Sequence, residues 1–277
     1  MNQGGHIALH HIPRPQSQAD PIIVTHGTIS NGESVQPLAE YLVSQGYDCW
    51  ILEWGGHGHS KAARRNQDFE YPALNDIPTA INTVLSETGK KRIHWVSHSG
   101  GGHLALMYLC RLPKQRAKIA SLVSLGAQAT DGANGFKLKF RAIGLYTITR
   151  IFGRTPKAIV SVGTEGEPSL LLAQWAKWNL TKRWKGSDGL DYLKKITELE
   201  HPSLIICGSA DDIAPVTGCH KIYHALGSTQ KDWIECGKSH GFSKDFTHGQ
   251  LVRGRSAQQE IFPKIGEWLN ELASSIC

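Results

Sequence analysis

The sequence contains no run of eighteen apolar residues and no apolar segment behind a basic start at its N-terminus. A membrane-spanning helix needs about 20 apolar residues, and a secretory leader needs an apolar core of roughly 7–15 residues. We therefore expect a soluble protein in the cytoplasm. Repeats and low-complexity segments are also missing from the 277 residues, of which 40% are hydrophobic. This length allows one large domain, or one domain with an insertion.

Cysteine pairs with the spacing of metal or redox motifs are missing as well. None of the six cysteines belongs to a Cys-x-x-Cys pair, so their spacing indicates neither a zinc site nor a redox motif. Cys49, Cys207 and Cys236 lie in apolar runs, where a free thiol packs like a small hydrophobic group. These positions favour a reducing compartment, although the number of cysteines also permits disulfides.

Acidic residues are absent from one segment of this basic chain, whose net charge is +6. Six basic residues occur at 136–157: Lys137, Lys139, Arg141, Arg150, Arg154 and Lys157. Such a segment can attract anionic ligands or a membrane surface, but it can equally be a solvated helical face. Because these residues do not share one helical face, we predict at most a weak contact with a lipid interface. We expect no nucleic-acid partner, and the oligomeric state stays open.

Most of the chain alternates strand-like and helix-like segments. Strands are predicted for the short apolar runs at 21–25, 47–54, 92–97, 118–127, 201–208 and 231–236, with a further candidate at 6–13. This alternation is typical of an α/β fold in which helices cover both faces of a mainly parallel sheet.

Residues 131–200, called the cap below, break this alternation. They contain aromatic residues at helical spacing and no clear strand; among them are Phe136, Phe140, Tyr146, Trp175, Trp178 and Trp184. We predict that the cap is a helical insertion over the C-terminal edge of the sheet. The core of the single catalytic domain then consists of residues 1–130 and 201–277.

The segment VSHSGGGH (96–103) lies between a predicted strand and a predicted helix, where ligands of parallel sheets bind. A nucleophile on a tight strand–turn–helix elbow needs small residues two positions away on either side. Ser99 has Ser97 and Gly101 at those positions, whereas Ser97 would have Trp95 at one of them. Ser99 is therefore the better candidate nucleophile. A phosphate-binding loop is the alternative, but the segment lacks the lysine and the glycine spacing of a P-loop.

Two backbone N–H groups are candidates for an oxyanion hole. Gly100 follows the nucleophile and opens a helix, so its N–H has no partner within that helix. The second donor normally comes from the loop after an earlier strand, and Thr28 follows the apolar run at 21–25. We predict that the N–H groups of Gly100 and Thr28 form the hole.

These motifs resemble those of the α/β-hydrolase superfamily, and the resemblance covers nearly the whole chain outside the cap. It depends on five short motifs in their usual order: HG at 26–27, GGHGHS at 55–60, SHSGG at 97–101, GSADDIAP at 208–215 and KSHGF at 238–242. Ser97 stands where the pattern G-x-S-x-G has its first glycine, and a serine is small enough to fit there. The resemblance implies a serine esterase or lipase-like enzyme with a variable helical cap.

The resemblance also implies a catalytic triad in the chain order serine, acid, histidine. A serine needs a histidine to accept its proton and a carboxylate to orient that histidine. His240 follows the predicted strand at 231–236 by a short loop, which is the position that the resemblance implies for the base. His248 lies one loop later and is the less favoured histidine.

Alignment of GSADDIAP (208–215) with the superfamily implies that Asp211 is the acid. The neighbouring Asp212 is the first alternative. Two other carboxylates, Glu53 and Asp131, lie at the ends of other predicted strands, and relatives sometimes use the location of Asp131, which is a minor alternative.

The remaining histidines carry less information. His57 and His59 form an H-x-H pair that could bind a metal, but such a site needs at least a third ligand. In the superfamily, this loop is structural or lines the pocket. His98 beside the nucleophile is better suited to packing than to proton transfer. We therefore predict no metal site and no cofactor.

The predicted reaction is hydrolysis of a carboxylic ester through an acyl-enzyme. Ser99 attacks the carbonyl carbon while His240, oriented by Asp211, accepts the proton. The aromatic residues of the cap favour an apolar acyl or aromatic group, unless they only dock the cap on the sheet. Thioester hydrolysis, C–C bond hydrolysis or acyl transfer by the same residues are alternatives. A ligand-binding protein without catalysis is the alternative from another class.

Overall fold

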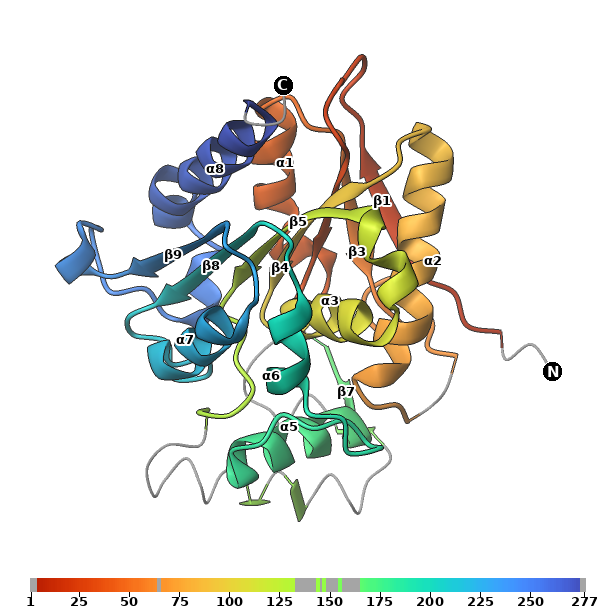
Figure 1. The fold of residues 1–277 in the computed structure, drawn as a ribbon, viewed down its shortest axis with the longest axis vertical. Coiled ribbons are helices and arrows are strands. Elements are labelled where there is room, and N and C mark those ends of the chain that lie inside the picture. The colour runs from red at the N-terminus through yellow and green to blue at the C-terminus, as the bar shows by residue number, and fades with distance from the viewer. Residues whose placement is uncertain are drawn as a thin grey trace.

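The computed structural model describes residues 4–63, 66–132, 143–144, 146–147, 154–155 and 165–274. These residues form a seven-stranded sheet with the order β1-β3-β2-β4-β5-β8-β9 (Figure 1). The strands are β1 (Ala8–Ile12), β2 (Ile22–Thr25), β3 (Cys49–Glu53), β4 (Ile93–His98), β5 (Ile119–Leu125), β8 (Ser203–Gly208) and β9 (Lys231–Cys236). Strand β1 is antiparallel to β3, and the other neighbours are parallel. The predicted mainly parallel sheet is confirmed.

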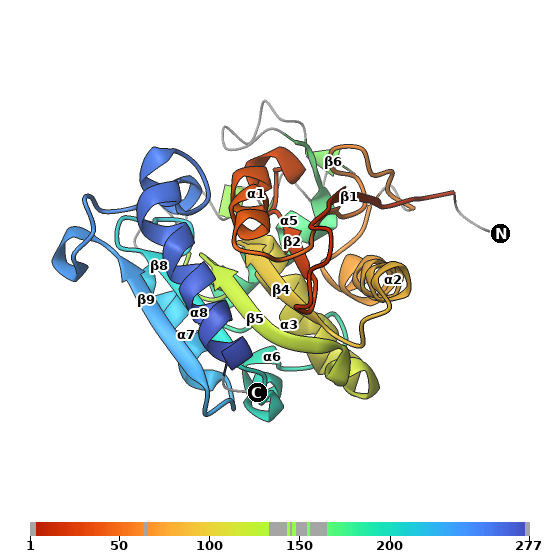
Figure 2. The ribbon, with the colours of Figure 1, turned by 90° about the horizontal axis from the view of Figure 1, so that it is seen from above.

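Helices cover both faces of the sheet, as predicted (Figures 1 and 2). They are α1 (Gln36–Ser44), α2 (Glu70–Thr88), α3 (Gly100–Arg111), α7 (Val216–Ala225) and α8 (Phe262–Ser274). Helices α1 and α8 contribute to one hydrophobic core, and α2, α3 and α7 to another. Strand β2 serves both cores because successive side chains point to opposite faces: Ile22 and Val24 belong to the first and Ile23 to the second. The five cysteines in the described ranges are free and buried.

The described end of the cap lies over the C-terminal edge of the sheet. It contains α5 (Ser169–Thr181), α6 (Tyr192–Lys195) and a two-stranded sheet of β6 (Arg154–Thr155) and β7 (Glu167–Pro168). Asn179 of α5 accepts hydrogen bonds from the Gln128 side chain and the Gly132 N–H, which both follow β5. The β6–β7 pair corrects the expectation of a cap without strands, because two-residue strands leave no alternating pattern in a sequence. The boundaries of core and cap stay a prediction.

Two aromatic side chains of the cap dock it on the core. Trp178 and Trp184 are 1% and 0% exposed. The ring of Trp178 lies 5.2 Å from that of Phe69, and the ring of Trp184 lies 5.6 Å from that of His103 in α3. The sequence allowed two roles for the aromatic residues of the cap: lining a substrate pocket, or docking the cap on the sheet. Trp178 and Trp184 dock the cap.

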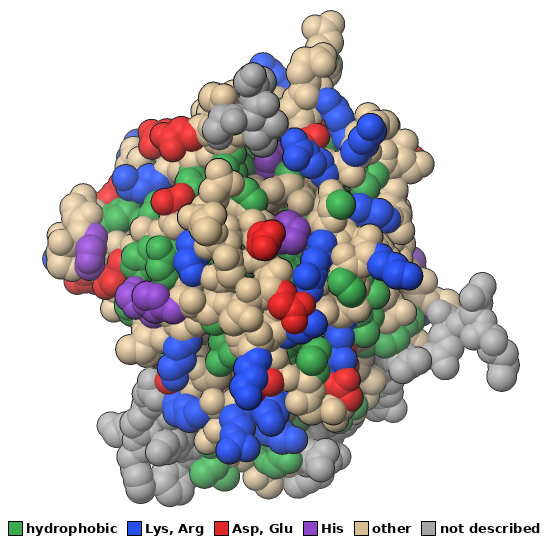
Figure 3. All heavy atoms as spheres, in the orientation of Figure 1, with side chains coloured by type: hydrophobic (Ala, Val, Ile, Leu, Met, Phe, Trp, Pro, Cys, Tyr) green, Lys and Arg blue, Asp and Glu red, His purple; other side chains and the backbone are tan. Residues whose placement is uncertain are grey.

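Most of the basic segment 136–157 lies outside the described residues, as do Phe136 and Phe140, so its contact with a lipid interface stays a prediction. Further basic side chains gather near the end of α5, at the lower edge of the molecule in Figure 3. The exposed ones are Lys177, Lys182, Arg183 and Lys185. Across the ranges that the structure describes, every helix is too short or too polar to cross a membrane.

Candidate active site

Ser99 occupies a sharp turn between β4 and α3, where the sequence predicts an elbow. Its backbone has φ 52° and ψ −117°, and its N–H donates a hydrogen bond to the Leu125 carbonyl oxygen at 2.8 Å. A positive φ is rare for a residue other than glycine, and such strain often occurs at functional sites. Ser97, the other serine of the segment, donates its hydroxyl proton to the Val123 carbonyl oxygen at 3.1 Å and is part of the sheet.

Small residues allow this turn to approach β2. A Cβ atom at Gly101 would lie 2.6 Å from Thr25 Cγ2 and 2.8 Å from the His26 carbonyl oxygen. A Cβ atom at Gly27 would lie 2.7 Å from Ser99 Cβ. Any larger side chain would therefore push the turn away from the end of β2, which explains the small residues on both sides of Ser99.

The two predicted oxyanion donors lie next to each other. A Cβ atom at Gly100 would lie 3.0 Å from the backbone nitrogen of Thr28. Among the hydrogen bonds of the described residues, none uses the N–H of Gly100 or of Thr28. Both N–H groups are therefore available to an anionic oxygen at the elbow.

Asp211, which follows β8, is paired with a histidine. His248 Nδ1 donates a hydrogen bond to Asp211 Oδ2 at 2.7 Å, and the exposed fractions of the two side chains are 13% and 0%. Asp211 Oδ1 accepts the N–H groups of Ile213 and Ala214 at 2.9 and 2.7 Å. Burial alone would raise the pKa of Asp211, but the hydrogen bond and charge of His248 and these two N–H groups lower it below its ordinary value. The carboxylate is therefore ionised.

The prediction of His240 as the partner of Asp211 is wrong. The His240 side chain is 48% exposed; its Nδ1 lies 3.0 Å from Ser239 Oγ and 3.9 Å from Glu235 Oε1. Residues 237–245 form an excursion after β9, so the first histidine after this strand lies on the surface.

The chain returns to the sheet at Phe246. The Phe246 N–H donates to the Cys236 carbonyl oxygen at 3.2 Å, and the Ala210 N–H donates to the Phe246 carbonyl oxygen at 3.1 Å. Thr247 and Gln250 then form a capping box around a short 3-10 helix that begins at His248. This T-x-x-Q pattern is the sequence signal that could have marked His248 as the start of a new turn.

His248 lies beside the elbow. Its ring centroid is 4.6 Å from that of His98, and His98 Nε2 donates to the His248 carbonyl oxygen at 3.1 Å. A Cβ atom at Gly126 would lie 3.2 Å from His248 Nδ1, and Gly126 directly follows the Leu125 carbonyl that accepts the Ser99 N–H. The pKa of His98 is lowered to about 3, mainly by burial and secondly by the nearby His248. His98 is therefore neutral, and it positions His248 by packing.

The other candidate carboxylates are not paired with His248. Asp212 is exposed. Asp131 Oδ2 lies 2.7 Å from Lys221 Nζ, and its Oδ1 lies 3.4 Å from Lys182 Nζ. Glu53 contacts histidines at the sheet edge, as described below. Asp211 is therefore the carboxylate that faces His248.

Comparisons with known proteins agree with this architecture. A family model for the alpha/beta hydrolase fold matches residues 20–147. The chain has the α/β-hydrolase fold. It superimposes on a monoglyceride lipase from Saccharomyces cerevisiae with a TM-score of 0.74 and 16% identity, covering 97% of this chain and 92% of that one. A monoacylglycerol lipase from Paleococcus ferrophilus gives a TM-score of 0.65 with 19% identity, covering 97% of this chain and 99% of that one.

Sequence similarity to this chain is found among lipases. Lipase 3 of Drosophila melanogaster is 27% identical over an alignment of 146 positions, and the match covers 46% of this chain and 37% of the relative. The chain spans less than half of the length of the curated relatives that it matches. The resemblance seen in the sequence motifs is thus confirmed, and with it the fold.

Proposed function

We propose that this α/β-hydrolase cleaves carboxylic esters through Ser99, His248 and Asp211. The observation that carries the proposal is the partly buried, hydrogen-bonded pair of Asp211 and His248 beside the turn at Ser99, whose φ is positive. The proposed triad differs from the predicted one only in its histidine.

Each residue has a distinct role in the proposed reaction. His248 Nδ1–H is held by Asp211, so Nε2 accepts the proton of the Ser99 hydroxyl as its oxygen bonds to the ester carbonyl carbon. The former carbonyl oxygen becomes an oxyanion that accepts the N–H groups of Gly100 and Thr28. His248 then gives its proton to the departing alcohol oxygen. Water, activated in the same way, releases the acid from the acyl-enzyme.

The similar proteins support an ester with an apolar acyl group as the substrate, because several are named lipases. The buried Trp178 and Trp184 add no support for it, since they are docked against the core. Thioester hydrolysis, C–C bond hydrolysis and acyl transfer to another acceptor would use the same residues. These remain the alternatives that substrate profiling must separate.

A fluorophosphonate probe tests the nucleophile. We expect one equivalent of label on the wild-type protein and none on Ser99→Ala, with Ser97→Ala as the matched control that keeps its label. Labelling of Ser99→Ala at the wild-type level would contradict the assignment of the nucleophile. A folded wild-type protein that takes no label would favour the non-catalytic alternative.

A substrate series tests the bond that is cleaved. We expect p-nitrophenyl esters to be hydrolysed with a kcat/KM that rises from short to medium acyl chains, and coenzyme A thioesters of the same acids to react more slowly. The reverse preference would replace ester hydrolysis with thioester hydrolysis.

A cytoplasmic location and a weak lipid contact of residues 136–157 remain proposals. Replacing Lys137, Arg141, Arg150 and Arg154 by glutamine should lower binding to anionic vesicles in a sedimentation assay. Binding that does not fall would contradict the lipid contact.

A further inference from the structure

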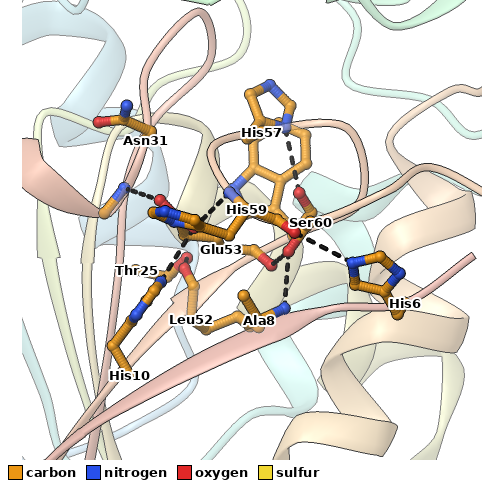
Figure 4. Close-up of polar contacts among 12 residues, drawn as sticks. His6, Ala8, His10, Thr25, Asn31, Leu52, Glu53, His57, His59 and Ser60 are labelled. Atoms are coloured by element: carbon orange, nitrogen blue, oxygen red, sulfur yellow. Dashed lines mark hydrogen bonds and ion pairs between the residues drawn. The ribbon is translucent and has the colours of Figure 1, made fainter.

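The two histidines of the GGHGHS loop point in different directions. His57 turns into the molecule, where its Nε2 donates a hydrogen bond to Glu167 Oε2 in β7 at 2.5 Å; both side chains are fully buried. His59 turns toward β1 at the edge of the sheet (Figure 4). The H-x-H pair therefore does not act as a unit, and each histidine belongs to a different cluster.

His59 meets two further residues with metal-binding side chains. His10 Nε2 in β1 lies 3.0 Å from Glu53 Oε2, and His59 Nδ1 lies 3.1 Å from the same oxygen (Figure 4). These three atoms all lie within 4.8 Å of one another, and no other group of three such ligands occurs in the described ranges. The two partners of His59 thus come from the antiparallel strand β1 and the end of β3, and His57 is not one of the three.

The carboxylate at the centre of this cluster is held rigidly. Glu53 is 2% exposed, its Oε1 accepts the Gly32 N–H at 2.9 Å, and its Oε2 accepts the His59 N–H at 2.8 Å. Gly58 has φ +52°, and a Cβ atom there would overlap the Glu53 carboxylate. The loop is therefore shaped around this side chain.

A second set of contacts fixes the loop to the edge strand. The Ala8 N–H donates to Ser60 Oγ at 2.7 Å, and the Ser60 hydroxyl donates to the Glu53 carbonyl oxygen. His10 is paired in register with Ile51, so it lies on the same face of the sheet as Glu53. Strand and loop thereby present the two imidazoles to the carboxylate from two sides.

We propose that His10, Glu53 and His59 bind one divalent transition-metal ion, with Zn²⁺ as the best match. Two imidazole nitrogens and one carboxylate oxygen suit Zn²⁺ and its neighbours, whereas Mg²⁺ and Ca²⁺ prefer oxygen ligands alone. An ion about 2.1 Å from each ligand places tetrahedral neighbours roughly 3.4 Å apart, so the separations of 3.0 and 3.1 Å from Glu53 would each open by a few tenths of an ångström when the ion binds. Each neutral imidazole carries its proton on the other nitrogen when it binds the ion.

The exposure of the imidazoles leaves room for further ligands. The side chains of His10 and His59 are 42% and 78% exposed, so water completes the coordination. The ion links β1 to the GGHGHS loop and takes no part in the proposed ester hydrolysis. The site therefore does not depend on the proposed function.

Metal titration of the protein without a histidine tag, after treatment with a chelator, tests the site. We expect one equivalent of Zn²⁺ by calorimetry, a visible absorption spectrum with Co²⁺ and a raised Tm with either ion. Mg²⁺ and Ca²⁺ should have no such effect. Loss of a residue that only supports a ligand commonly costs 10–100-fold in affinity, so His10→Ala and His59→Ala should each weaken binding by at least about tenfold.

His11→Ala is the matched control. His11 lies in the same strand, and its Nε2 donates to Asp48 Oδ1 at 2.8 Å with 38% of its side chain exposed, so it has a carboxylate partner but no third ligand. We expect this variant to bind Zn²⁺ like the wild type. Wild-type protein that binds no ion, or His10→Ala and His59→Ala variants that bind as the wild type does, would overturn the proposal.

Discussion

The elbow after β4 and the loop after β9 reach the same edge of the sheet but are held in different ways. Ser99 keeps its positive φ because the residues next to it are small and pack directly against β2. His248 reaches the site only because Phe246 bonds to Cys236 and Ala210 after a nine-residue excursion at 237–245. The position of the proposed nucleophile is thus set locally, and that of the proposed base by contacts between distant parts of the chain.

Among variants that keep both the proposed nucleophile and the proposed base, the largest effect is expected at the residue that joins the two regions. Asp211→Asn should lower kcat by about 10⁴-fold, because an amide no longer fixes the tautomer of His248. The exposed neighbour Asp212 provides the control, and Asp212→Asn should change kcat less than threefold. Ester hydrolysis rates of both variants, with their Tm, make the comparison. Equal losses in the two variants would contradict the assignment of the acid.

The next largest effect on kcat is expected when a methyl group is added at Gly100, in the elbow. A Cβ atom at Gly100 would lie 2.9 Å from Thr28 Cγ2 and 3.0 Å from Thr28 N, the other proposed donor. Alanine keeps the N–H of residue 100, but its Cβ would displace Thr28, so Gly100→Ala should lower kcat by about 10²–10³-fold, the usual cost of one lost oxyanion donor. Gly249→Ala, next to His248 and with open space around its Cα, should keep its activity. A Gly100→Ala enzyme with wild-type kcat would remove Gly100 and Thr28 from the proposed hole.

Two buried histidines, one at the start of β4 and one in α3, should make stability depend on pH. Burial lowers the pKa of His94 and His103 to about 4, so the folded protein holds them neutral while the unfolded chain protonates them below about 6.5. Their contribution is present above pH 6.5 and is lost as the pH falls toward 4. His94→Gln should flatten this decline in the free energy of unfolding, measured with urea. His224→Gln, at an exposed site, serves as the control; equal flattening there would contradict the explanation.

The smallest effect is expected in the excursion after β9. Ser243 bonds to Glu260 through its N–H and its hydroxyl at 2.7 and 2.5 Å, on the surface. Ser243→Ala removes the second bond and should cost less than about 1 kcal/mol of stability. Because Phe246 anchors the chain beyond this point, kcat should change less than threefold. A tenfold loss of kcat would mean that the whole excursion positions His248.

Local patterns made the fold and the elbow predictable. Alternating apolar segments predicted the parallel sheet and its helices, and the small residues around Ser99 selected it over Ser97. The neighbouring positions of Gly100 and Thr28 follow from the same local rule, since both lie at the ends of adjacent strands β4 and β2.

Long-range contacts could not be predicted in the same way. The distance of His240 from β9 resembled the usual pattern, but nothing in that distance shows that the chain leaves the sheet and returns at Phe246. The cluster of His10, Glu53 and His59 likewise depends on β1 pairing antiparallel with β3. Register and loop paths of this kind are set by tertiary packing, not by local spacing.

The most direct measurement compares His248→Ala with His240→Ala. Both histidines follow β9, but only His248 contacts Asp211. Steady-state hydrolysis of one p-nitrophenyl ester should show kcat reduced by about 10⁴–10⁶-fold for His248→Ala and less than threefold for His240→Ala. The reverse order, with His240→Ala inactive and His248→Ala active, would contradict the proposed triad.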